Sequence, residues 1–513
     1  MLLHRFLEQA AARTPDAIAV IETKRQTTYQ ELDRLANRIA HCLIGSGVAR
    51  GDRVLLALDN CVELIGAYIG AMKAGAIAVP LPPGPRSDRL GRAVLDCTPS
   101  AAVVDPATAR EAQPGHPLTG VPAIFVAGAG ANRSSAVALD TAIAACPDTA
   151  PDVRASDVDL AAIIYTSGST GEPRGVMLSH RNFVTNAHSI IAYLGLTSSD
   201  RVMAVLPFYY VYGLSLLHTH LAVGGTIVID NRFTFPNIVL NAMREHGVTG
   251  FAGVPSSFAL LLHRSALNEI QLPALRYVTQ AGGSMAPPRI REWLARGPQV
   301  PFYVMYGATE AAARLTYLEP SMLNTKLGSI GKAIPNVEIL VVDEQDRVAA
   351  PGQVGELVAR GDNISTGYWN DAEETARKFG PLGYRTGDLG YVDDEGFLFL
   401  VGRKHDMLKI GAHRAGAKEI EDVLQEFPGV HEVAVVAAPH ELLGEVPIAF
   451  LSFRDGFTGD ATELEAFCRP RLAQYKVPAQ FVVMQELPKI GAVGKIDKAR
   501  LRDVARETFA GTV

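Results

Sequence analysis

Short runs of β-branched residues alternate with longer segments of helical period along the whole chain. The clearest runs are DRVLLAL at 52–58, AAVVD at 101–105, AAIIYT at 161–166, GTIVID at 225–230 and EILVVD at 338–343. This alternation predicts an α/β fold with helices packed on mostly parallel sheets. Residues 105–158 are rich in Ala, Pro, Gly and Asp, which predicts a surface excursion. With 513 residues, the chain is long enough for more than one domain.

The pattern changes near residues 402–406, where GRKHD follows a strand-like run and a compact unit begins. The segment 418–427 places four apolar residues on one helical face, namely Ile420, Val423, Leu424 and Phe427. Asp460 and Glu463 form a capping box that predicts a second helix. Strands are expected at HEVAVVA, 431–437, and at FVVM, 481–484. These features predict a small α+β domain at the C-terminal end, after a large N-terminal domain of packed α/β subdomains.

Charge and cysteine content exclude several classes of protein. The net charge of −6 and the scattered basic residues argue against nucleic-acid binding. The five cysteines form no C-x-x-C pair, so a disulfide framework or a zinc site is not expected, and a reducing, cytoplasmic location fits best. The amphipathic start is not typical of a signal peptide. The apolar run from Leu64 ends at Lys73, which predicts a buried helix and no membrane span.

A loop rich in glycine and hydroxyl residues stands out at 163–182, IIYTSGSTGEPRGVMLSHRN. Glycines let backbone N–H groups converge on an anion, hydroxyl groups add donors, and an arginine adds a bidentate charge. A phosphate chain is the natural ligand, whereas a polar turn is the simpler alternative. The spacing matches neither a Walker A loop nor a G-x-S-x-G nucleophile elbow. The residues concerned are Thr166, Ser167, Gly168, Ser169, Thr170, Gly171 and Arg174.

The segment YTSGSTGEPRGV at 165–176 resembles the phosphate-binding signature of the acyl-adenylate-forming (AMP-binding) superfamily. That superfamily includes acyl- and aryl-CoA synthetases, peptide-synthetase adenylation domains and luciferases. Arg174 stands where the family usually has lysine. Further segments resemble other family signatures, in the family's order, over nearly the whole chain. They are GGSM at 282–285, YGATE at 306–310, GELVARGDNISTGYWND at 355–371, YRTGDLG at 384–390, GRKHDMLKIGAHRAGAKEIE at 402–421, LAQYKVP at 472–478 and LPKIGAVGKIDK at 487–498.

The resemblance implies that a carboxylate attacks the α-phosphate of ATP in the presence of Mg²⁺ and releases pyrophosphate. The loop then holds the β- and γ-phosphates, Glu310 ligates Mg²⁺ and Thr309 contacts the α-phosphate. The resemblance also implies that Asp388 binds the ribose hydroxyls and that Lys495 bridges the carboxylate and phosphate oxygens. As isolated residues, Glu310 and Lys495 could be solvated and Asp388 could cap a turn. Other nucleotide contacts are assigned to Gly283, Ser284, Met285, Tyr306, Gly307, Ala308 and Arg403.

The resemblance also implies that the C-terminal domain is mobile. In the family it rotates about a hinge residue between adenylation and thioester formation, and His405 stands at that position. The chain therefore divides into an N-terminal AMP-binding and substrate domain over 1–402, a hinge over 403–406 and a C-terminal lid domain over 407–513. Histidine is unusual at this hinge. It could make the rotation sensitive to pH, although a tolerated substitution is the simpler interpretation.

The substrate pocket is expected near LPFYYVYGLS at 206–215. No aspartate lies between Leu206 and Leu217, so a plain α-amino acid substrate is disfavoured. Arg314 could pair a second acidic group, but a structural salt bridge is the default expectation. The candidate pocket residues are Tyr209, Tyr210, Tyr212, Gly253, Gly282 and Ala312. They indicate a mostly apolar pocket for a small carboxylic acid.

The sequence also bears on which molecule accepts the acyl group. CoA-using relatives commonly have a Gly-Gly pair beside the pantetheine tunnel, and this chain has Gly411 and Ala412, followed by His413. A thioester ligase that uses CoA is the first expectation. The alternative is an adenylating enzyme that transfers to carrier-protein pantetheine or to a nitrogen nucleophile. A binder without turnover is a third possibility, against which the intact Glu310, Asp388 and Lys495 argue.

Overall fold

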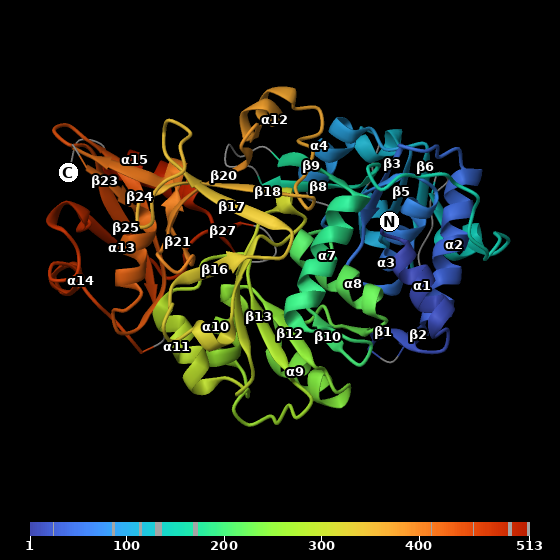
Figure 1. The fold of residues 1–513 in the computed structure, drawn as a ribbon, viewed down its shortest axis with the longest axis horizontal. Helices are drawn as coiled ribbons and strands as arrows, with labels where there is room; N and C mark the ends of the chain where they lie inside the picture. Colours follow the sequence, from blue (N-terminus) through green and yellow to red (C-terminus); the bar gives the residue numbers. More distant parts are fainter. Residues whose placement is uncertain are drawn as a thin grey trace.

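The computed structural model of this chain has two large sheets in its N-terminal part and a smaller sheet in its C-terminal part (Figure 1). The structure describes residues 1–23, 25–84, 88–111, 115–128, 136–167, 173–411, 413–454, 456–490 and 495–509. The α/β layers expected from the alternating sequence pattern are present. The C-terminal part, orange to red in Figure 1, lies to one side of the N-terminal sheets.

The first sheet has the strand order β7-β6-β5-β3-β4-β8-β9. All neighbouring strands are parallel except the β8–β9 pair, which is antiparallel and flanks the glycine-rich loop. The strands are β3 (Arg53–Ala57), β4 (Ile77–Pro80), β5 (Ala101–Val104), β6 (Ala123–Val126), β7 (Ala136–Ala138), β8 (Leu160–Ser167) and β9 (Pro173–Ser179). Three of the runs singled out in the sequence, at 52–58, 101–105 and 161–166, thus form buried strands of one sheet.

The prediction of a surface excursion over 105–158 is wrong for the described residues up to 143 and holds for 144–158, which are irregular and largely exposed. Strands β6 and β7 extend the first sheet from this segment, and Leu118 and Val126 are buried. The strands are short, and the surrounding Ala, Pro and Gly residues mask their apolar pattern in the sequence.

The second sheet has the order β17-β18-β20-β21-β16-β15-β14-β13-β12-β10-β11-β1-β2, with β19 paired to β20. Pairing is parallel from β1 through β11, β10, β12 and β13 to β14. The strands are β1 (Ile18–Glu22), β2 (Arg25–Thr28), β10 (Arg201–Ala204), β11 (Thr226–Ile229), β12 (Gly250–Gly253), β13 (Tyr277–Gln280), β14 (Phe302–Tyr306), β15 (Thr316–Leu318), β16 (Ser329–Ala333), β17 (Val337–Val342), β18 (Gly355–Gly361), β19 (Phe379–Gly380), β20 (Gly383–Val392) and β21 (Leu398–Arg403).

From β14 onward, neighbouring strands of this sheet are antiparallel. The run at 338–343 is a strand as predicted, but it belongs to this antiparallel half. Parallel neighbours need crossover connections of a dozen or more residues, whereas these strands are joined mainly by shorter ones. The expectation of mostly parallel sheets therefore holds for the first sheet and for half of the second.

Helices pack on the sheets of the N-terminal part. Several begin at sequence signals, such as the capping boxes of Thr28 with Glu31 and of Ser179 with Asn182. The helices are α1 (Arg5–Arg13), α2 (Tyr29–Gly45), α3 (Val62–Lys73), α4 (Asp88–Cys97), α5 (Pro106–Glu111), α6 (Leu139–Ile143), α7 (His180–Leu194), α8 (Val211–Val223), α9 (Pro236–Glu245), α10 (Pro255–Arg264), α11 (Pro287–Arg296) and α12 (Ala372–Lys378), with 3₁₀ turns η1 (Pro117–Gly120), η2 (Thr309–Ala311) and η3 (Pro320–Met322).

The C-terminal sheet has the order β23-β22-β25-β24, with β26 paired to β25, and a separate β27–β28 hairpin follows. The capping box at Asp460 starts α14 as predicted. Helix α13 ends at Leu424, before Phe427, because the following Pro428 disfavours helix. The elements are η4 (Lys404–Asp406), β22 (Met407–Ile410), β23 (His413–Gly416), α13 (Ala417–Leu424), β24 (Val430–His440), β25 (Gly444–Phe453), α14 (Ala461–Cys468), η5 (Gln474–Lys476), β26 (Gln480–Val483), β27 (Lys489–Ile490), β28 (Lys495–Ile496) and α15 (Lys498–Phe509).

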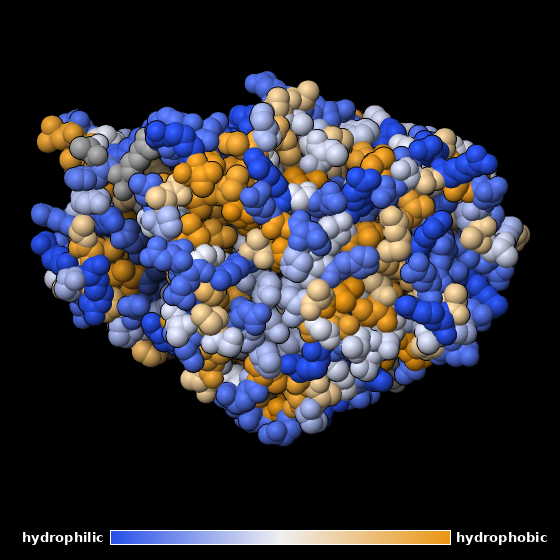
Figure 2. All heavy atoms as spheres, in the orientation of Figure 1, coloured by the Kyte–Doolittle hydropathy of each residue, from blue (hydrophilic) through white to orange (hydrophobic). Residues whose placement is uncertain are grey.

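The apolar run from Leu64 lies in α3, which is buried on every side as the sequence predicts. Even Lys73, its last residue, is 3% exposed, and its ammonium group contacts Asp33 at 2.7 Å and Glu8 at 3.0 Å. Within the described residues, no helix combines the length and apolarity needed to cross a bilayer. Figure 2 shows hydrophilic residues over much of one face, with hydrophobic residues gathered over β17 and β20.

We expect Phe258→Ala to lower the free energy of unfolding by about 3–5 kcal/mol, because it leaves a cavity in a tight aromatic cluster. Phe258 is fully buried and meets Trp293, Phe251 and Phe302 edge to face. Urea unfolding followed by tryptophan fluorescence measures this directly, since Trp293 is one of two tryptophans. The matched control is Phe235→Ala, at a side chain that is 63% exposed. Equal shifts of the urea midpoint in both variants would contradict the prediction.

Candidate active site

A large cavity opens at the carboxyl ends of the parallel strands β12, β13 and β14. Because parallel neighbours end on the same edge of a sheet, the loops that follow these strands meet there. Strands β20 and β21 and part of the C-terminal domain complete its wall. Seventeen residues named from the sequence line this one cavity: Thr166, Arg174, Tyr209, Tyr210, Tyr212, Gly282, Gly283, Ser284, Met285, Tyr306, Gly307, Ala308, Thr309, Glu310, Arg314, Asp388 and Arg403.

Some predicted residues are not brought to the cavity wall. Gly253 and Ala312 are buried beside it, and their neighbours Val254 and Ala313 line it instead. Gly411 and His413 lie exposed at the turn between β22 and β23, and the His413 ring stacks on Tyr475 with 4.2 Å between ring centroids. Other candidates fall outside the described residues: Gly168, Ser169, Thr170, Gly171 and Ala412, together with the side chains of Ser167, His405 and Lys495.

Gly307 lets the segment after β14 fold back tightly on itself. A Cβ atom at this position would lie 1.8 Å from the carbonyl oxygen of Ala313, so no other residue fits without a shift of the backbone. The close approach of the Gly307 and Ala313 backbones places Thr309 and Glu310 in the short η2 helix at the cavity wall. The close backbone contact therefore requires glycine at this position of the YGATE segment, which the sequence alone does not reveal.

Asp388 is held by residues from two other strands. The Tyr306 hydroxyl donates to Asp388 Oδ2 at 2.6 Å, and Arg403 Nε lies 3.3 Å from Asp388 Oδ1. Arg403 stands opposite Asp388 in the antiparallel register of β20 and β21. Burial, and then the nearby carboxylate, raise the pKa of Tyr306 well above its ordinary value, so the phenol stays a donor. The site thus contains an oriented carboxylate able to accept hydrogen bonds from a ligand's hydroxyl groups.

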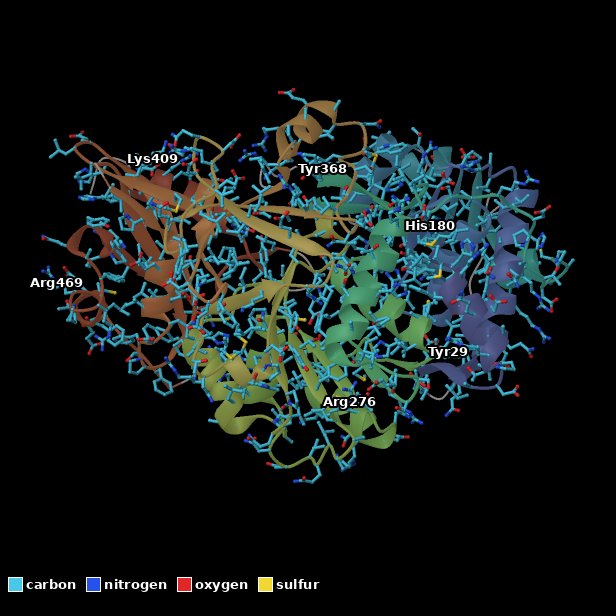
Figure 3. The ribbon with its side chains drawn as sticks, viewed as in Figure 1. Tyr29, His180, Arg276, Tyr368, Lys409 and Arg469 are labelled. Carbon is cyan, nitrogen blue, oxygen red and sulfur yellow. The ribbon has the colours of Figure 1, made fainter. Side chains whose placement is uncertain are left out.

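Glu310 is the second oriented carboxylate. The Tyr368 hydroxyl donates to Glu310 Oε1 at 2.7 Å. Burial, and then the charge of Glu310, raise the pKa of Tyr368 above its ordinary range, so this hydroxyl also remains protonated. Tyr368 follows β18 and lies beneath α12, as labelled in Figure 3. This partner was not identified from the sequence, although Tyr368 lies in the recognised segment 355–371.

Arg174 stands on β9, directly after the glycine-rich loop, and lines the cavity. Its Nε lies 3.3 Å from Asp371 Oδ2, and its Nη1 lies 3.3 Å from Glu374 Oε1, at the start of α12. Its guanidinium carbon is 6.0 Å from the centroid of the Tyr368 ring. A planar guanidinium can bridge two carboxylates in this way, whereas an ammonium group is a point charge without that geometry. The arginine therefore joins the loop to α12 and to the tyrosine that holds Glu310.

Lys378, the last residue of α12, is a cation of the cavity that the sequence did not single out. Its Nζ donates to the carbonyl of Arg385 at 3.2 Å. Burial, and then neighbouring Arg377, lower its pKa, while Glu310 acts in the opposite direction. The one sequence signal for Lys378 is its spacing of four residues from Glu374, which places both residues on the same face of one helix.

Aromatic side chains form one wall of the cavity, as the sequence predicts. The rings of Tyr209 and Tyr210 lie 4.7 Å apart between centroids. The Tyr212 hydroxyl donates to the carbonyl of Thr279 at 3.1 Å, so its ring faces the pocket while its polar end is satisfied. Arg314 lines the same region. The arrangement suits an acid whose body is mainly apolar.

The C-terminal domain lines part of the cavity with α13, β24, β25 and α15 and also with its β27–β28 hairpin. Lys489, Ile496 and Asp497 line the wall. Lys495 pairs with Ile490 within this hairpin, so its backbone lies next to wall residues. The hairpin thus lines the cavity that holds the two oriented carboxylates, whereas Gly411 and His413 of the β22–β23 turn do not.

Glu310 suits a hard divalent cation such as Mg²⁺. Among the described residues there is no group of three or more His, Cys, Asp or Glu side chains placed to hold a metal. Mg²⁺ is commonly held by one or two carboxylates plus substrate phosphates and water, and it does not need a protein cage. A single oriented carboxylate at the wall of a cavity fits that mode.

Comparisons with known proteins agree with this geometry. The chain is 32% identical to indoleacetate–CoA ligase of Aromatoleum aromaticum, over 99% of both chains. It is also 32% identical to a segment of a linear gramicidin synthase of Brevibacillus parabrevis, over 98% of this chain and 6% of that protein. The fold is similar to o-succinylbenzoate CoA synthetase from Bacillus subtilis in complex with its acyl-adenylate intermediate, with a TM-score of 0.85, 28% identity and coverage of 97% and 98%.

Two family models match the chain. The model for the AMP-binding enzyme C-terminal domain matches residues 419–495, which end at the first residue of β28. The model for the AMP-binding enzyme itself matches residues 7–369, which is more than half of the chain and includes the glycine-rich loop, Glu310 and Tyr368. The resemblance seen in the sequence is confirmed, and this chain belongs to the AMP-binding enzyme family.

Proposed function

We propose that this chain activates a carboxylic acid with ATP and then transfers the acyl group to the thiol of CoA. In the first step, a carboxylate oxygen bonds to the α-phosphorus of ATP and the bond to the bridging oxygen breaks, which releases pyrophosphate. In the second step, the thiolate sulfur bonds to the acyl carbon and AMP leaves with the carboxylate oxygen. The observation that carries the proposal is that two oriented carboxylates, Glu310 and Asp388, share one cavity with an aromatic acid pocket.

The nucleotide would lie along the edge where β13, β14 and β20 end. Asp388 has its geometry fixed by Tyr306 and Arg403, and we assign it to the ribose hydroxyls. The backbone at Gly283, Ser284 and Met285 is assigned to the adenine, and Thr309 to the α-phosphate. We assign the phosphate chain to the segment 166–171 together with Arg174.

Stabilisation of the extra negative charge is the main task of the first step. Mg²⁺ held by Glu310 would supply Lewis-acid stabilisation of phosphate oxygens. Lys495 is assigned to bridge the carboxylate and the α-phosphate from the C-terminal domain. Lys378 adds a partly buried cation to the same wall. The Tyr368 hydroxyl orients Glu310 by donating to its Oε1.

The proposed division of the chain is 1–402, 403–406 and 407–513, with the middle segment as a hinge. Ionic contacts on the two sides of this segment support it. Lys404 Nζ contacts Glu356 of the N-terminal part at 3.2 Å, whereas Asp406 Oδ1 contacts Arg502 of the C-terminal domain at 2.9 Å. His405 lies between these two contacts. Rotation at this point would move the β27–β28 hairpin away from the cavity and bring the β22–β23 turn to it. That turn contains the proposed acceptor-tunnel residues Gly411, Ala412 and His413.

Transfer to carrier-protein pantetheine is the second candidate for the last step. The similarity to a segment of the linear gramicidin synthase favours a carrier protein as acceptor. The matched segment is only 6% of that protein, so this chain corresponds to one part of a much larger synthase. The similar indoleacetate–CoA ligase spans the same length as this chain, which favours free CoA as the first choice.

We expect Tyr368→Phe to lower the rate of acid-dependent ATP–pyrophosphate exchange by about 10- to 100-fold, because Glu310 loses the partner that orients it. Glu310→Gln should lower the rate at least as far. The control is Tyr391→Phe, a tyrosine stacked on Phe399 away from the cavity wall. Exchange that persists unchanged in Glu310→Gln would remove Glu310 from the proposed site.

Arg174→Ala should raise the KM for ATP by about 10-fold or more, since a charged hydrogen-bond donor is lost next to the phosphate loop. Arg174→Lys should be tolerated, with a smaller rise, because the charge remains while the two-carboxylate bridge to Asp371 and Glu374 is weakened. Arg181→Ala is the matched control, since this arginine pairs with Asp157 at the surface. An unaltered KM in Arg174→Ala would place Arg174 outside the site.

The acceptor is tested by adding CoA, or a phosphopantetheinylated carrier protein, to a reaction that already forms adenylate. Mass spectrometry should detect an acyl-CoA thioester. An acylated carrier protein without acyl-CoA would favour the second candidate, and hydroxylamine capture without either thioester would show that the adenylate forms but that neither thiol accepts the acyl group.

A further inference from the structure

We propose that the acid activated by this chain carries a second carboxylate and that Arg314 binds it. This inference rests on the proposed function, because it names the substrate class of the same pocket. It starts from a buried cation that the adenylation chemistry does not use.

Arg314 follows the η2 helix and is only 2% exposed, yet it lines the cavity. Its guanidinium lies between α7 and α8. Nε donates to the Tyr193 hydroxyl at 3.2 Å, and the guanidinium carbon lies 4.9 Å from the centroid of the Tyr212 ring. The charge is therefore placed against the aromatic wall of the acid pocket.

Within the described part of the chain, no carboxylate lies within ion-pair distance of Arg314. The structural salt bridge that the sequence made the default expectation is absent there. Burial raises the pKa of Tyr193 and raises that of Tyr212 to about 12, so neither phenol supplies a negative charge at neutral pH. A buried guanidinium without an anionic partner is unfavourable, and an anionic ligand would remove that penalty. Other buried cations of this chain, such as Lys73, have carboxylate partners.

The neighbours of Arg314 hold the guanidinium in place without neutralising it. The Tyr193 ring stacks on Tyr317 with 4.2 Å between centroids, and the Tyr212 hydroxyl is tied to Thr279. Both tyrosines are thus fixed by contacts on their far sides. A preorganised donor aimed at a pocket is what selective binding of an anion requires.

The backbone that carries Arg314 is also held in an uncommon conformation. Ala312 and Ala313 have φ angles of 53° and 120°, a region that non-glycine residues rarely adopt. The side-chain amides of Asn186 and Asn363 each donate to the Arg314 carbonyl at 3.0 Å and secure the turn. Such conformations persist where the surroundings determine them and are concentrated at functional sites.

A carboxylate is the ligand group that best fits these observations. Its two oxygens match the fork of a guanidinium, and the tyrosine-lined wall can accept the apolar part of the acid. A ligand amine would be repelled by Arg314. A purely apolar acid would leave the guanidinium without a partner, so it should bind more weakly than its dicarboxylic counterpart.

The test is acid-dependent ATP–pyrophosphate exchange with matched pairs of equal carbon skeleton. The pairs are butanedioate and butanoate, pentanedioate and pentanoate, hexanedioate and hexanoate, and benzene-1,2-dicarboxylate and benzoate. For the pair whose size fits, the wild-type chain should prefer the diacid by about 10- to 100-fold in kcat/KM. Arg314→Met should abolish this preference while exchange with the monoacid persists, and Arg314→Lys should retain part of it. A wild-type preference for the monoacids would overturn the inference, even if the variants do not fold.

Arg276→Met is the matched control. Arg276 also lies over a tyrosine ring, at 5.0 Å from the Tyr277 centroid, but it precedes β13 and so lies at the end of that strand away from the cavity (Figure 3). Its loss should lower the thermal stability and leave the ratio between diacid and monoacid unchanged. The same change of ratio in both variants would mean that Arg314 acts only through stability, which would overturn the inference.

Calorimetric titration of the diacids into the wild-type chain and into Arg314→Met separates this inference from the proposed function. Diacid binding that depends on Arg314, without exchange for any acid, would retain the inference and overturn the adenylation proposal. Exchange that is equal for both members of each pair and unaffected by Arg314→Met would retain adenylation and overturn the inference. Neither exchange nor diacid binding would overturn both.

Discussion

The contact of Asp388 with Tyr306 and Arg403 connects the parts of the structure that must cooperate. Tyr306 ends the last parallel strand of the second sheet, Asp388 lies in its antiparallel half, and Arg403 ends the strand that leads to the C-terminal domain. Burial alone would lower the pKa of Arg403, but the charge of Asp388 helps to raise it above its ordinary value, so the guanidinium stays charged. One carboxylate therefore lies both at the proposed nucleotide edge of the cavity and beside the start of the proposed hinge.

A second connected set of contacts explains why an arginine can serve at position 174. In Arg174, one planar group contacts two carboxylates of the α12 region and lies near the ring of Tyr368, which in turn holds Glu310. The geometry of the glycine-rich loop and that of the carboxylate proposed to bind the metal are thus linked through one short helix. A lysine would keep the charge but could not make the same planar bridge, so the arginine in this chain has a structural role beyond its charge.

The sequence predicts well those features that depend on local pattern. The β-branched runs form strands, the capping box at Asp460 begins a helix, and every recognised segment except 472–478 contributes residues to a common cavity. Its failures concern contacts between distant residues. The bond from Tyr368 to Glu310 joins residues 58 positions apart, and the spacing of neither segment implies it. The antiparallel half of the second sheet was also missed, because alternation of strands and helices does not reveal how strands pair.

Lys73 and Arg314 are both buried cations, and the kind of partner that each has distinguishes them. Both are almost inaccessible to solvent, but Lys73 contacts acidic partners away from the active-site cavity, whereas Arg314 is held by tyrosines and lines that cavity. A carboxylate supplied by the protein would stabilise the Arg314 guanidinium, but it would also cancel the positive potential in the pocket. Tyrosines orient the guanidinium and do not neutralise its charge. An anionic ligand would therefore stabilise the guanidinium when it binds. Within the described residues Arg314 has tyrosine neighbours but no carboxylate partner, and this is the property on which its proposed role in specificity rests.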